Sequence, residues 1–178
     1  MRRTLTTSML GMAILVAAVV ALAGVHGEAA EHAPKAASEA AFEQLTSLVG
    51  EWQGTQQGVA VTLTYTLTAD GTALMEQMQP AGSAAMITMF TVDGERLLAT
   101  HYCSAGNQPQ MATGAIKEPE TKSLTFSLVR VTGMKTPGDF HNTGVMVRLE
   151  DKDHLTQEWT YLDHGKSGTN VFRYERKR

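Results

Sequence analysis

Val59, Val61, Leu63, Tyr65 and Leu67 alternate with Ala60 and then with four threonines up to residue 68. A period of two places the apolar side chains on one face, which is typical of a half-buried β-strand. The dipeptide Asp70-Gly71 follows this segment, and it is the strongest short-range signal for a β-hairpin. A tight turn at this point predicts three facing pairs across the hairpin: Leu67 with Leu74, Tyr65 with Glu76, and Leu63 with Met78.

The rest of the chain continues as short segments separated by turn residues. A second hairpin is predicted at Asp93-Gly94, and later strands are predicted at residues 108–117, 123–131, 144–150, 155–162 and 169–176. The connections are too short for crossover helices, so neighbouring strands should pair antiparallel. Because a long sheet tends to close and so remove its edges, we expect an all-β fold, an up-and-down barrel of about eight to ten strands. A β-sandwich is the alternative.

A short helix should precede the sheet. Ser38 is placed to cap its first turn, and apolar residues then recur at helical spacing: Ala41, Phe42, Leu45, Leu48 and Val49. Gly50 is suited to end the helix. A helix this short is marginal alone and must pack on the sheet.

The first 27 residues have the pattern of an export signal. Arg2 and Arg3 precede an apolar stretch over residues 9–25, and small residues offer cleavage sites at its end. A membrane anchor is the alternative, because the stretch is near the lower length for a span. Cleavage would leave a flexible leader, residues 28–37, a domain of residues 38–178 with no stable membrane span, and a periplasmic or secreted protein.

Charge and cysteine content narrow the functional classes. The chain has a formal net charge of −3 and a single cysteine, Cys103. Nucleic-acid binding would favour a basic surface, so it is not expected. One cysteine forms no internal disulfide, and the domain must therefore depend on packing.

Two features give the chain a family resemblance. Gly50-Glu51-Trp52 after a short helix, with Arg173 on the last strand, resembles the lipocalin-like calycins. The resemblance implies that Trp52 closes one end of the barrel and that a late arginine, Arg173 or alternatively Arg176, packs across it. The Thr-Asp-Tyr motif of true lipocalins is missing.

The chain is also similar to a group of secreted bacterial proteins of unknown function with a calycin-like barrel. The similarity lies in residues 48–55, 71–76, 93–98 and 101–109. This group implies a fold and no activity. A more distant likeness is to the haem-binding nitrobindin-like barrels, whose iron-ligating histidine matches no histidine of this chain.

The densest polar segment is residues 101–109. His101 and Cys103 are two residues apart and share a face of a strand, and Asn107 and Gln108 follow in a rim loop or bulge. One hypothesis is a ligand site at the barrel mouth. The alternative is a core histidine, a small buried thiol and a turn that satisfies its own backbone. Thiol catalysis is not favoured, because no oxyanion motif accompanies the pair.

Further candidates lie on the apolar strand faces. Glu76 faces Tyr65 in the predicted hairpin, so it either fixes a polar ligand group or lies near solvent at an open end. The predicted cavity walls comprise Tyr65, Glu76, Met86, Phe126, Gln157 and Trp159. The methionines fall on opposite faces and no histidine pair has zinc spacing, so no metal site is predicted.

Together these patterns predict an exported barrel that binds a small, mostly apolar molecule, and they favour a binding protein over an enzyme. One alternative is a filled barrel that docks a protein partner or a second copy of itself through an exposed apolar patch. Another is a haem-binding barrel.

Overall fold

The computed structural model describes residues 36–118 and 122–178. The predicted export signal, and all but the last two residues of the predicted leader, lie outside these ranges. The described elements are one helix and ten strands: α1 (Ala37–Thr46), β1 (Gly50–Gln56), β2 (Val59–Thr68), β3 (Ala73–Pro80), β4 (Met86–Asp93), β5 (Arg96–Tyr102), β6 (Gln108–Ala112), β7 (Ser123–Thr132), β8 (His141–Leu149), β9 (His154–Asp163) and β10 (Lys166–Arg176).

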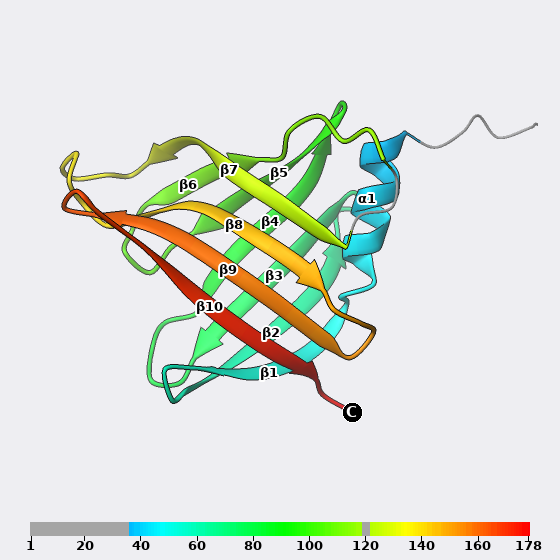
Figure 1. Ribbon diagram of the computed structural model, residues 1–178, viewed down its shortest axis with the longest axis horizontal. Coiled ribbons are helices and arrows are strands. Elements are labelled where there is room, and N and C mark those ends of the chain that lie inside the picture. Colours follow the sequence, from blue (N-terminus) through cyan, green and yellow to red (C-terminus); the bar gives the residue numbers. More distant parts are fainter. Residues whose placement is uncertain (1–35, 119–121) are drawn as a thin grey trace, which may run out of the picture. The chain divides into compact units, whose positions relative to one another are not determined.

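The ten strands form a closed antiparallel barrel (Figure 1). Each strand pairs with the next in sequence, and β1 pairs with β10 to close the ring, with Gly54 opposite Tyr174. This confirms the predicted up-and-down barrel and excludes the sandwich. Because the ring is closed, each of the ten described strands has a hydrogen-bonded neighbour on both sides.

The β2–β3 hairpin has the predicted register. Tyr65 lies opposite Glu76, and the other two predicted pairs are also present. The next hairpin differs by one residue from the prediction: Asp93 pairs with Arg96, so the two-residue turn is Gly94-Glu95 rather than Asp93-Gly94. Gly94 has a positive φ of 59°, which glycine adopts without strain.

Helix α1 lies at one end of the barrel (Figure 1). It begins at Ala37, and the predicted cap at Ser38 is wrong, because no side chain caps this helix. The Ser38 hydroxyl instead donates a 2.6 Å hydrogen bond to the carbonyl oxygen of Gly94. The side chain thus ties the helix to the β4–β5 turn.

Trp52 lies fully buried near α1. Its indole N–H donates to the Leu48 carbonyl oxygen at 2.8 Å, and the Arg176 guanidinium lies 4.1 Å from the centroid of its ring. Arg176 also donates to the carbonyl oxygens of Ser47 and Val49. The guanidinium thereby connects β10, the end of the helix and the indole.

The prediction that Arg173 packs across Trp52 is wrong. Arg173 is exposed, whereas the alternative, Arg176, lies over the indole. The register explains the difference: Arg176 is directly opposite Trp52 in the β1–β10 pair, while Arg173 is opposite Thr55, three residues further along β1.

This geometry predicts a difference between two arginine variants. Arg176→Ala should lower the free energy of unfolding by about 2 kcal/mol, because it removes a cation–π contact and several hydrogen bonds to backbone carbonyls. Arg173→Ala, an exposed change on the same strand, should stay within about 0.5 kcal/mol of the wild type. Urea denaturation followed by circular dichroism measures both. Equal losses in the two variants would contradict the assigned role of Arg176.

Candidate functional site

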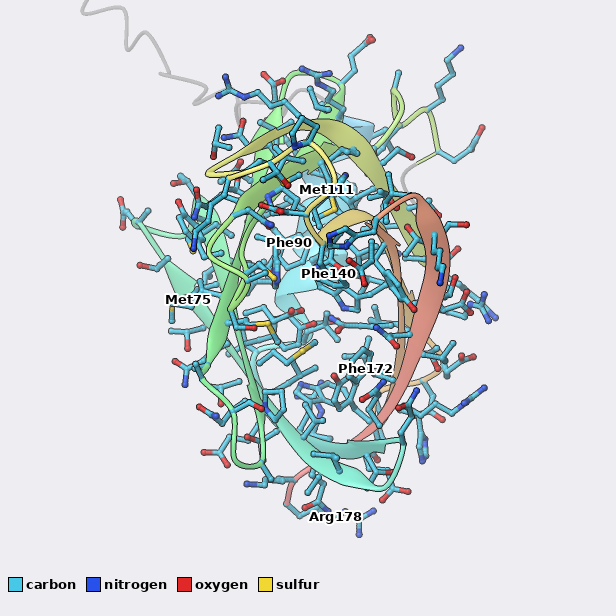
Figure 2. The ribbon with its side chains drawn as sticks, turned by 90° about the vertical axis from the view of Figure 1, so that its left-hand side faces the viewer. Met75, Phe90, Met111, Phe140, Phe172 and Arg178 are labelled. Carbon is cyan, nitrogen blue, oxygen red and sulfur yellow. The ribbon has the colours of Figure 1, made fainter. Side chains whose placement is uncertain are left out.

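A pocket of about 350 Å³ opens at one end of the barrel. Two of its lining residues, Ser104 and Ala105, belong to the β5–β6 connection, which lies at the end of the barrel away from α1 (Figure 1). Figure 2 shows this end, with Phe140 and Phe172 inside the ring of strands and Met75 on its outer face. The lining is mostly apolar or sulfur-bearing, with two asparagines, one histidine and one serine: Met78, Met86, His101, Cys103, Ser104, Ala105, Phe140, Asn142, Trp159, Asn170 and Phe172.

The structure brings four predicted site residues into this pocket, namely Met86, His101, Cys103 and Trp159. His101 on β5 and Cys103, the first residue after β5, both line the pocket, as their spacing of two indicates. The His101 ring also packs against Trp159, with 4.7 Å between the ring centroids. The pocket wall therefore combines the β4–β5 hairpin with β9, a strand more than 50 residues further along the sequence.

A buried hydrogen-bond network lies beside the pocket. Glu76 is 1% exposed, so the alternative that it lies near solvent at an open end is wrong. Oε2 of Glu76 accepts from the Tyr65 hydroxyl at 2.5 Å and from Gln157 Nε2 at 2.5 Å. Gln157 Nε2 also donates to the Tyr65 hydroxyl, and Gln157 Oε1 accepts from the Trp159 indole at 3.0 Å. A carboxylate placed among apolar strands is thus supplied with donors, as burial requires.

Thr88 links this network to the pocket. Its hydroxyl lies 3.4 Å from Glu76 Oε1 and 3.0 Å from His101 Nδ1. His101 is only 2% exposed, and its other ring nitrogen, Nε2, is buried without a hydrogen-bond partner. Buried polar atoms nearly always have a partner, so this nitrogen is an exception that calls for an explanation.

Burial shifts the pKa values of these groups. Burial raises the pKa of Glu76, although hydrogen bonds from Tyr65, Gln157 and Thr88 oppose the shift. Burial, and secondly the nearby Glu76, raise the pKa of Tyr65 well above its usual value. Burial lowers the pKa of His101 to about 4. The His101 ring is therefore neutral at pH 7 and keeps one nitrogen free to accept a hydrogen bond.

The lowered pKa of His101 predicts a loss of stability in acid. The unfolded chain binds a proton near pH 6.5, whereas the folded chain binds it only near pH 4. The stabilisation is therefore fully present above pH 6.5 and is lost as the pH falls towards 4, by on the order of 3 kcal/mol. Urea unfolding at several pH values in this window measures the loss. Subtracting the free energies of unfolding of His101→Gln from those of the wild type isolates the contribution of the His101 ring. A difference that does not change with pH would contradict the lowered pKa of His101.

Six predicted wall or rim residues do not line the pocket: Tyr65, Glu76 and Gln157, which form the network beside it, and Phe126, Asn107 and Gln108. Phe126 is fully buried and packs against Phe90, with 5.4 Å between the ring centroids. Asn107 is buried, and its amide donates to the Phe140 carbonyl oxygen at 2.6 Å, which connects two loops at the rim. Gln108 is half-buried and bonds to Gly106 and Thr132. These side chains shape the rim and core and are absent from the pocket wall.

Several residues of the site were not predicted from the sequence, among them Thr88 of the network and Phe140 and Asn142 of the pocket wall. Thr88 falls between Met86 and Phe90 on the inner face of β4, so alternation could have identified it. The other two lie where alternation gives no guidance. Phe140 precedes β8, and the register of β8 shifts between Asn142 and Gly144.

Two further features concern metal ligands and membrane spans. Within residues 36–118 and 122–178, no group of three or more His, Cys, Asp or Glu side chains could hold a metal ion. No helix in the same ranges has both the length and the apolar character to cross a membrane.

The fold defines the class of protein: a ten-strand antiparallel barrel with one short helix. No protein-family model matches the chain, and no curated protein matches it. Among solved structures, it is similar to Rv2717c from M. tuberculosis, with a TM-score of 0.57 and 12% identity over 78% of this chain and 98% of the other.

A second similar structure is a protein of unknown function from the DUF3598 family of Nostoc punctiforme. Its TM-score is 0.50 at 16% identity, over 75% of this chain and 49% of the other. At these identities the two likenesses show the fold alone. Neither description mentions a lipocalin, so that family remains a resemblance.

Proposed function

We propose that this barrel binds a small, mostly apolar molecule in the pocket at its open end, with one hydrogen-bonding group of the ligand placed against His101 Nε2. The observation that carries the proposal is the unpartnered, buried Nε2 atom on a residue that lines the pocket. A buried nitrogen without a partner costs free energy, which a ligand donor or acceptor would recover.

The pocket wall supports the same conclusion. Aromatic side chains and methionines provide apolar area, and Asn142 and Asn170 provide polar groups. The volume of about 350 Å³ falls at the lower end of the range for small-molecule sites. Methionine side chains adapt readily to the shape of a ligand. These properties favour a ligand of about one or two rings.

Export is a further part of the proposal. The pattern of residues 1–27 supports cleavage and a periplasmic or secreted location. Comparing the N-terminal sequence of protein recovered outside the cytoplasm with that of the full chain tests this part. A protein retained in the cytoplasm with its first residues intact would contradict it.

The single thiol offers a direct test of binding. Cys103 lines the pocket, so N-ethylmaleimide attached to Cys103 should fill the space after the chain has folded. We expect native mass spectrometry of protein purified from its own cells to show a retained small molecule, and reagent treatment to displace it. Cys103→Ser, treated identically, should keep the molecule. No retained mass in the untreated protein, or equal retention after blocking, would contradict the proposal.

Haem is a second candidate, and the same atom favours it, because a neutral imidazole nitrogen facing a pocket is a common iron ligand. Absorption spectra of the purified protein before and after haem addition decide between the two. A Soret band that disappears in His101→Gln would support haem. A featureless spectrum after haem addition would exclude it.

A further inference from the structure

The direction of the hydrogen bonds in the buried network follows from Trp159. An indole N–H can only donate, so the Gln157 atom that faces it is the carbonyl oxygen Oε1. The Gln157 amide nitrogen must then point the other way, towards Glu76 and Tyr65, and its two hydrogens match its two acceptors there. The Tyr65 hydroxyl accepts one of them and donates its own hydrogen to Glu76 Oε2.

This arrangement leaves one position for a proton on Glu76. Oε2 already accepts two hydrogen bonds, so a proton on the carboxyl group belongs on Oε1, the atom that faces Thr88. When Glu76 is ionised, Thr88 donates to Oε1 and accepts from His101 Nδ1–H, which leaves Nε2 an acceptor. When Glu76 is protonated, the two hydrogen bonds that link Glu76, Thr88 and His101 reverse their direction, and His101 Nε2 carries a hydrogen. The charge of Glu76 therefore determines whether His101 Nε2 accepts or donates a hydrogen bond in the pocket.

We propose that the hydrogen-bonded side chains of His101, Thr88 and Glu76 together accept the proton of a weakly acidic aromatic hydroxyl compound, a phenol. The pocket then holds the ligand as its anion. This inference rests on the proposed function. The ligand O–H proton moves to Nε2, the Nδ1 proton moves to Thr88 Oγ1, and the Thr88 proton moves to Glu76 Oε1. The products are a phenolate, a neutral imidazole with hydrogen on Nε2, and a neutral carboxyl group.

The surroundings favour this transfer. Burial raises the pKa of Glu76, so the carboxyl group readily accepts a proton. The groups nearest to Glu76 are the hydroxyls of Tyr65 and Thr88, the Gln157 amide and, at longer range, Tyr174, and none of these carries a positive charge. Proton transfer therefore moves one negative charge from the buried carboxylate to the ligand oxygen in the pocket. There His101 Nε2–H can donate to the phenolate oxygen, and the aromatic ring of the ligand can pack on Trp159.

The chemically matched probes are 4-nitrophenol, whose colour reports its own ionisation, and 4-nitroanisole, which has no hydroxyl proton. Both should quench Trp159 fluorescence if they bind. In a buffer acidic enough for the free phenol to stay colourless, we expect wild-type protein to bind it as the coloured phenolate. Thr88→Ser should keep the colour, and Thr88→Val should lose it, because only serine maintains the hydroxyl relay.

Glu76→Gln provides the second test. The carbonyl oxygen of glutamine must accept from Tyr65 and Gln157, so its amide would donate permanently towards Thr88 and fix a hydrogen on Nε2. In the same acidic buffer this variant should bind the phenol about tenfold more weakly, without colour. Wild-type protein that binds the phenol in its neutral, colourless form would overturn the relay while leaving the pocket intact. Binding of neither probe would overturn the proposed function as well.

Discussion

Replacing Trp52 with alanine is expected to lower the free energy of unfolding by about 4 kcal/mol, the largest effect of any single change considered. The indole is fully buried, donates to the Leu48 carbonyl oxygen and lies under the Arg176 guanidinium. Alanine would remove all three interactions and leave a cavity at the end of the barrel near α1. Urea denaturation followed by far-ultraviolet circular dichroism measures the loss without depending on tryptophan fluorescence.

Trp52→Phe is the matched control. Phenylalanine keeps most of the buried apolar area but cannot donate to Leu48, so the loss should be intermediate, about 2 kcal/mol. A loss below about 1 kcal/mol in the alanine variant would show that this end of the barrel does not depend on the indole.

The second large effect is expected at the buried network. Gln157→Leu should lower the free energy of unfolding by about 3 kcal/mol at pH 7. Leucine leaves the indole N–H of Trp159 without its acceptor and removes one of the donors to Glu76. Gln77→Leu, an exposed glutamine change on β3, is the control and should stay within about 0.5 kcal/mol of the wild type.

The Gln157 penalty should depend on pH. Burial already raises the pKa of Glu76, and loss of a donor to the carboxylate raises this pKa further in the variant. A carboxyl group whose folded pKa is raised favours the folded state below its unfolded pKa, and it loses that contribution as the pH rises through the folded pKa. The penalty should therefore shrink as the pH falls and the carboxyl group takes up its proton. A penalty that grows in acid would contradict the raised pKa.

The sequence predicts the barrel well where alternation and turn chemistry agree. The β2–β3 register follows from the apolar face of residues 59–68 and from Asp70-Gly71, because a one-residue slip would move every apolar side chain to the other face. The same alternation identifies His101 and Cys103 as neighbours on one face. Arg173 shows the limit: choosing between Arg173 and Arg176 requires the pairing of β1 with β10, strands at opposite ends of the chain.

The candidate site is less predictable than the barrel. Glu76 opposite Tyr65 is readable from one hairpin, but its burial depends on Gln157, 81 residues away. Phe140 and Asn142 escape prediction because they lie beside an irregular part of β8. The unpartnered Nε2 of His101 emerges only when every neighbouring strand is in place. Long-range packing determines these features, and local sequence patterns do not predict that packing.

Histidine side-chain nitrogen NMR tests the central claim, that the open end of the barrel holds a small apolar molecule against His101 Nε2. The probe is p-cresol, added to ¹⁵N-labelled protein, with the exposed His154 and His164 as internal references. We predict that the Nε2 resonance of His101 shifts with saturation while the two references stay fixed. An unchanged His101 resonance at saturating cresol, or equal shifts at all three rings, would contradict binding at this site.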